Sequence, residues 1–138
     1  MNSKLLLRIA AALILVHLLG HTIGHLTWDA PEDKQMAEVV AVMKGYKTEF
    51  MGAEKSMADY HNGYSLMIFG LFGMTMLILW FSASFVNANI AIAKKVLYPI
   101  GVVYLIFGIV EYKYFFPFAA ITSFVAGLLV VIAIMRKQ

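Results

Sequence analysis

The chain has 138 residues, of which 62% are hydrophobic and only 14% are charged. Water-soluble domains are nearer half apolar and a quarter charged, so this composition predicts a single domain embedded in a membrane. The absence of cysteine excludes a disulfide framework, a thiolate metal site, an iron–sulfur cluster and a catalytic thiol. The formal charge of +3 is not gathered into a basic patch interleaved with aromatic residues, so nucleic acid is not an expected partner.

Four apolar runs are long enough to cross the hydrocarbon layer, at about residues 5–26, 57–82, 96–115 and 118–135. The first run follows a lysine and could be read as a secretory signal. No small-x-small cleavage site comes after it, so we interpret it as a retained helix. Pro117 leaves only a tight turn between the last two runs, which predicts an antiparallel hairpin. The expected fold class is all-α: an integral membrane four-helix bundle, with residues 1–138 as one transmembrane domain.

The segment between the first two spans, residues 27–55, is the only substantial polar stretch. Pro31 suits the first turn of a short helix and Gly45 suits its end. One apolar stripe follows i, i+3, i+4, i+7 spacing inside that helix, formed by Met36, Val39, Val40 and Met43. Such a stripe packs on the mouth of a bundle or lies among lipid headgroups. Just beyond, Ser56 followed by Asp59 is the pattern of a capping box at the start of the second span.

The basic residues predict the orientation in the membrane. One side collects six cations and no acid: Lys4, Arg8, Lys94, Lys95, Arg136 and Lys137. The other side collects five lysines and eight acids. The cation-rich side stays in the cytoplasm. We therefore expect a multi-pass protein of a bacterial inner (cytoplasmic) membrane with both termini cytoplasmic and the 27–55 loop outside.

All four histidines fall in two places. His17, His21 and His25 are four residues apart in the first span, so they share one face of a helix. His61 lies one turn into the second span, beside Asp59. The topology places Glu111 near the outer end of the third span. It thereby predicts that three helices bring His21, His25, His61, Asp59 and Glu111 to one level near the outer face.

Imidazole and carboxylate groups together suit a transition metal. The predicted metal ligands are His21, His25, His61, Asp59 and Glu111, for an ion such as zinc or copper. The histidines His21, His25 and His61 are the predicted contacts for haem b. Two alternatives stay open: a hydrogen-bonded polar cluster with a structural role, and a pathway for protons or substrate. Glu111 and Lys113 are two residues apart and cannot face each other on a helix, so Glu111 needs another partner.

Gly20 and Gly24 are four residues apart in the first span. This spacing favours close packing of helices. The alternative is that the missing side chains leave room for a flat cofactor beside His21 or His25.

The stretches Leu19-Gly-His-Thr-Ile-Gly-His-Leu-Thr-Trp28, Phe50-Met-Gly-Ala53 and Ser56-Met-Ala-Asp-Tyr-His-Asn-Gly-Tyr64 carry a resemblance. The first half of the chain resembles a family of small uncharacterised bacterial four-helix membrane proteins and, more distantly, the DoxX-like proteins. The resemblance implies a four-helix fold in a bacterial inner membrane and implies no activity. It covers the positions of His21, His25, Asp59 and Gly63.

Two functional hypotheses follow. The first is a binding protein that holds a transition metal or haem at its outer mouth. The second is a membrane enzyme or quinone-linked subunit, in which a histidine accepts a proton from a lipid-soluble substrate and Glu111 or Asp59 orients it. A structural subunit of a larger membrane complex is a third alternative. The expected partners are the lipid bilayer and either further copies of the chain or other subunits.

Overall fold

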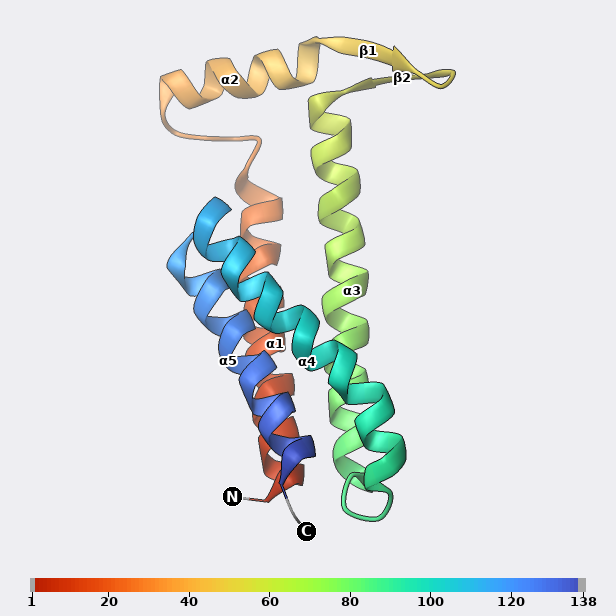
Figure 1. The fold of residues 1–138 in the computed structure, drawn as a ribbon. Helices are drawn as coiled ribbons and strands as arrows, with labels where there is room; N and C mark the ends of the chain where they lie inside the picture. The colour runs from red at the N-terminus through yellow and green to blue at the C-terminus, as the bar shows by residue number, and fades with distance from the viewer. Residues whose placement is uncertain (1, 137–138) are drawn as a thin grey trace. The chain divides into compact units, whose positions relative to one another are not determined.

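The computed structural model describes residues 2–136 and contains five helices and one two-stranded sheet within them (Figure 1). The helices are α1 (Ser3–Thr27), α2 (Lys34–Gly45), α3 (Met57–Phe85), α4 (Ile90–Tyr114) and α5 (Pro117–Met135). The strands are β1 (Lys47–Phe50) and β2 (Ala53–Ser56). Lys137, which entered the charge count, lies outside the described residues.

Helices α1, α3, α4 and α5 are each long and apolar enough to cross a membrane. This confirms the predicted all-α membrane fold with four spans. The helix that contains the third span begins at Ile90, six residues before the apolar run that starts near Val96. The side chain of Asn89 caps the helix by accepting a hydrogen bond from the backbone N–H of Ile92. Hydropathy alone misses these first turns because they carry Lys94 and Lys95.

The chain divides into two compact units, which we describe separately. The first unit contains α1 up to Leu19, α3 from Phe72, and the whole of α4 and α5. Its core holds the fully buried side chains Leu7, Ile14, Leu79, Leu97 and Val130. The hydroxyl of Ser3 donates a 2.7 Å hydrogen bond to the carbonyl of Ala133, which ties the start of α1 to the end of α5.

Helices α4 and α5 form the antiparallel hairpin that the sequence predicted, with Pro117 in the first turn of α5 (Figure 1). Glycines let the two backbones approach closely. A Cβ added at Gly108 would lie 2.6 Å from Cβ of Phe124, and one at Gly127 would lie 2.9 Å from the carbonyl oxygen of Gly101. These contacts are shorter than any real Cβ contact, so the α4–α5 interface requires glycine at both positions.

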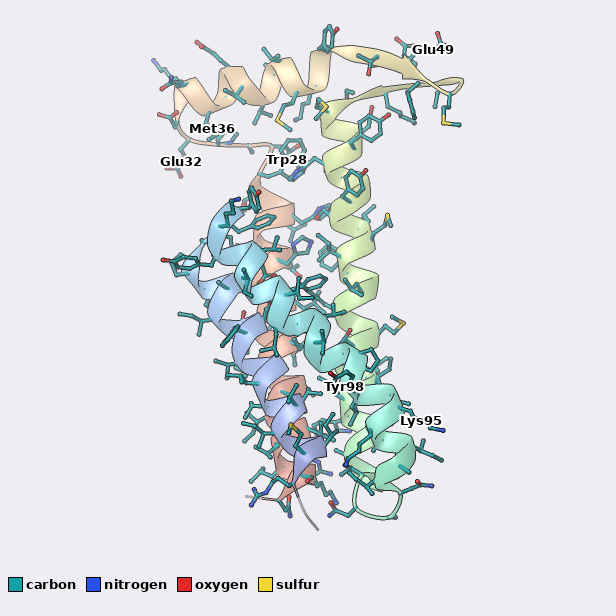
Figure 2. The ribbon with its side chains drawn as sticks, in the orientation of Figure 1. Trp28, Glu32, Met36, Glu49, Lys95 and Tyr98 are labelled. Atoms are coloured by element: carbon teal, nitrogen blue, oxygen red, sulfur yellow. The ribbon has the colours of Figure 1, made fainter. Side chains whose placement is uncertain are left out.

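The second unit spans residues 20–71 and contains the end of α1, α2, the hairpin and the first half of α3. The side chain of Asp33 caps α2 by accepting a hydrogen bond from the backbone N–H of Met36. On the predicted stripe, Val40 is buried, Met43 is half-buried, and Met36 and Val39 are exposed. Met36 is labelled on α2 in Figure 2. The stripe therefore buries one of its four side chains within the described residues.

The β1–β2 hairpin was not predicted from the sequence. Its strands pair antiparallel from Lys47 opposite Ser56 to Phe50 opposite Ala53. The turn places Met51 at φ 52° and Gly52 at φ 79°. Two consecutive residues at positive φ are typical of a two-residue type I′ turn, whose backbone twist matches the right-handed twist of the two strands that it joins. Methionine is an uncommon choice for the first of these positions, so the turn leaves little trace in the sequence.

Candidate functional site

Four buried polar residues of the first unit lie together, and we call His17, Glu111, Thr122 and Ser123 the His17 site. All four are buried, with exposed fractions between 0% for Ser123 and 8% for Glu111. They come from α1, α4 and α5. A buried polar group in a membrane span is costly unless it is paired, which makes such a cluster a candidate for function.

Glu111 needs a partner other than Lys113, and in the structure that partner is His17. Nε2 of His17 lies 3.7 Å from Oε1 of Glu111. This distance exceeds an ordinary hydrogen bond but keeps the two groups in direct electrostatic contact. The second carboxyl oxygen of Glu111, Oε2, is buried without a hydrogen-bond partner among the described residues.

The other ring nitrogen of His17, Nδ1, lies close to two hydroxyl groups. Nδ1 lies 3.0 Å from Oγ1 of Thr122 and 3.2 Å from Oγ of Ser123. The hydroxyl of Thr122 donates its own proton to the carbonyls of Phe118 and Ala119, each at 2.9 Å. Oγ1 therefore accepts from His17, and we assign the neutral-state proton to Nδ1. The lone pair of Nε2 then faces Glu111.

Aromatic rings pack beside the His17 site. The ring of Phe72 lies 4.6 Å from the ring of His17, and Tyr104 lies 6.2 Å from Phe72, measured between centroids. Phe72 and Tyr104 are buried. An apolar wall of this kind lowers the local dielectric and strengthens the interaction between imidazole and carboxylate.

In the second unit, His21 and His25 converge on one buried hydroxyl, that of Ser65. Nε2 of His21 lies 3.1 Å from the carbonyl oxygen of Ser65 and 3.0 Å from its Oγ. Nδ1 of His25 lies 2.8 Å from the same Oγ. A carbonyl can only accept, so His21 donates through Nε2 to the carbonyl of Ser65. We call His21, His25 and Ser65 the Ser65 site.

Two of the remaining predicted residues have local roles in the second unit. The ring of His61 packs on Trp28 at 4.4 Å, and the indole N–H of Trp28 donates to Asn62 at 3.1 Å (Figure 2 labels Trp28). The carboxylate of Asp59 accepts from the backbone N–H of Ser56 at 2.8 Å, and the hydroxyl of Ser56 accepts from the N–H of Asp59 at 3.1 Å. These reciprocal bonds are the predicted capping box.

Asp29 and Lys44 form an ion pair at the surface of the second unit, with 3.0 Å between Oδ2 and Nζ. The hydrogen bond and the charge of the Lys44 ammonium hold the pKa of the Asp29 carboxyl below its usual value. Lys44 also lies 5.9 Å from the ring of Trp28. This pair links α2 to the residues that follow α1.

The predicted ligands thus lie in distinct local settings. His21 and His25 share the Ser65 hydroxyl, His61 lies on Trp28, Asp59 caps α3, and Glu111 faces His17 in the other unit. Within residues 2–136, no group of three or more His, Cys, Asp or Glu side chains is placed to hold a metal ion together.

The sequence analysis assigned no role to three hydroxyl residues, Thr122, Ser123 and Ser65. Each stands within an apolar run, which was the available signal. No family model, no curated protein sequence and no solved structure matches this chain.

Proposed function

We propose that this small multi-pass membrane protein performs acid–base chemistry on a lipid-soluble substrate at the His17 site. One observation carries the proposal: a buried imidazole whose Nδ1 is held by Thr122 and whose Nε2 faces the Glu111 carboxyl at 3.7 Å. This is the arrangement of a general base with an orienting group on one side and a stabilising acid on the other.

The chemistry is a proton transfer. A substrate hydroxyl, such as that of a quinol, that reaches Nε2 of His17 loses its proton to this nitrogen and leaves the electron pair of the broken O–H bond on the substrate oxygen. The imidazolium that forms donates through Nδ1 to Thr122 and is stabilised by Glu111 in its carboxylate form. The low dielectric of the surrounding helices increases that stabilisation.

The test uses the full chain in proteoliposomes with decylubiquinol as the probe and a pH-indicator dye as the readout. We expect quinol binding to release a proton to the medium, because His17 passes on the proton that it has taken from the quinol. His17→Gln and Glu111→Gln should each abolish the signal. The matched control is Glu54→Gln, which removes an exposed carboxylate of the β1–β2 hairpin. Equal proton signals from the wild type and both site variants would rule the proposal out.

Transition-metal or haem b binding is the second candidate, favoured by the convergence of His21 and His25 on Ser65. Two imidazole nitrogens within 3.0 Å and 2.8 Å of one oxygen can turn toward a common ion if the hydroxyl moves aside. The hydrogen bonds that now occupy these nitrogens would be lost. An absorption spectrum and metal analysis of the detergent-purified protein test this candidate: a Soret band selects haem, and stoichiometric zinc or copper selects a metal site.

A further inference from the structure

A groove of about 480 Å³ lies between the first turns of α4 and the last turn of α5. Its lining residues are Lys94, Lys95, Tyr98, Pro99, Ile134 and Met135. All of them belong to the first unit. Figure 2 labels Lys95 and Tyr98 on this part of α4. The groove combines two cations with an apolar floor, a pairing that the proposed acid–base chemistry does not use.

Lys94 and Lys95, the two cations of the groove, are exposed. The sequence from Phe72 to Gln138 contains a single acidic side chain, Glu111. It is 16 residues beyond Lys95 on the same helix, or about 24 Å along the axis, and it faces His17. Among the described residues of the first unit, no other acidic side chain accompanies the two exposed lysines.

The rest of the groove suits a hydrocarbon chain. Pro99, Ile134 and Met135 supply apolar surface, and Met135 is 72% exposed. Tyr98, at 59% exposure, is an amphipathic ring of the kind enriched at the boundary between hydrocarbon and headgroups. Proline lacks a backbone N–H, so Pro99 also leaves the carbonyl of Lys95 without its usual helical donor.

From this combination we propose that the groove is a binding site for an anionic phospholipid. The phosphate lies at Lys94 and Lys95, the Tyr98 hydroxyl reaches the headgroup, and one acyl chain runs along Pro99, Ile134 and Met135. Basic pockets between spanning helices recognise anionic headgroups in this way.

The experiment exposes the detergent-purified full chain to an equal mixture of phosphatidylglycerol and phosphatidylcholine. Mass spectrometry then measures the lipid that stays bound after gel filtration. We expect phosphatidylglycerol to be retained at least fivefold over phosphatidylcholine. Lys95→Gln should reduce this preference about fivefold, and Lys94→Gln should act similarly, since each lysine near a lipid surface contributes on that scale.

Lys4→Gln is the matched control, because it removes the same charge from the same predicted side of the membrane without touching the groove. It should leave the preference nearly unchanged. Equal losses from Lys4→Gln and Lys95→Gln would overturn the proposal, because they would indicate a diffuse charge effect. A second measurement needs no variant: raising the salt from 50 to 500 mM should weaken the wild-type preference by screening the lysines. A preference that salt does not alter would overturn the proposal as well.

Discussion

Thr122 makes the clearest single-residue contribution to the His17 site. Its hydroxyl accepts from His17 while donating to two backbone carbonyls. Thr122→Val keeps the side-chain shape but leaves the Nδ1–H of His17 without this acceptor, so we expect a loss of about 1–3 kcal/mol in the free energy of unfolding.

Thr122→Ser keeps the hydroxyl and should retain most of that stability. Thermal unfolding in detergent compares the two variants, and ¹⁵N NMR of the imidazole reports the tautomer. A spectrum showing the proton on Nε2 in the wild type would contradict the assigned hydrogen-bond direction.

Asp29 should make the stability of the folded protein depend on pH, and the lowered pKa of its carboxyl gives the sign of that dependence. The Lys44 ammonium stabilises the carboxylate in the folded protein, so the contribution to stability is present above the unfolded pKa of about 3.9. It is lost as the pH falls through the lower folded value. NMR titration of the Asp29 carboxyl should give a midpoint below that of an unperturbed aspartate, and Lys44→Gln should raise it. A midpoint that Lys44→Gln leaves in place would mean that the ion pair is not formed in solution.

At the level of single residues, the sequence predicted individual partners better than the assembled site. It correctly indicated that Glu111 needs a partner other than Lys113, and it found the Ser56–Asp59 capping box. It could not name His17 as that partner, since the pairing depends on how α1 and α4 pack. Capping is a local interaction between residues three apart, whereas the His17 site depends on contacts between helices distant in sequence.

At the scale of the helices, the contact between α4 and α5 depends on glycines, which have no side chain to keep the backbones apart. Gly108→Ala would place a Cβ 2.6 Å from Cβ and 2.9 Å from Cα of Phe124, so the helices must separate. We expect a destabilisation of about 1–3 kcal/mol. Thermal unfolding of the variant in detergent measures it.

Gly70→Ala on α3 is the matched control, because nothing lies within 4 Å of the added Cβ. Replacing an open helical glycine should stabilise the protein by about 0.5–1 kcal/mol. Similar melting temperatures for the two variants would mean that the α4–α5 helices are not in close contact. The added Cβ at Gly24 also meets nothing within 4 Å, so this residue of the predicted Gly-x-x-x-Gly pair is not at a tight contact within the described residues.

The sequence predicted the four spanning helices but not the β1–β2 hairpin, and the reason is physical. Hydropathy identifies a span by its apolar length, so it found four helices and placed most of their ends within a few residues. The hairpin carries no such signal, because its strands are four residues long and exposed apart from Ser56. Its turn also uses methionine where asparagine or glycine is usual.

For the whole molecule, the distribution of charge predicts which side each loop faces. A cysteine introduced at Gln35, next to the start of α2, should react with an impermeant thiol reagent in intact cells. A cysteine at Asn89, between α3 and α4, should be protected until the membrane is permeabilised. The chain has no natural cysteine, so each variant reports a single position. Labelling of the Asn89 position from outside would refute the predicted orientation.

The short connection between α4 and α5 has a consequence for how the protein is made. Only Phe115 and Phe116 separate the last residue of α4 from the first residue of α5. A ribosome that has synthesised α4 has therefore not yet supplied the helix against which Gly108 packs. We expect the two helices to leave the insertion machinery together as one hairpin, carrying Lys113 across the bilayer with them. Nascent chains arrested before Phe124 should consequently still crosslink to the insertion machinery through α4, whereas released full-length chains should not.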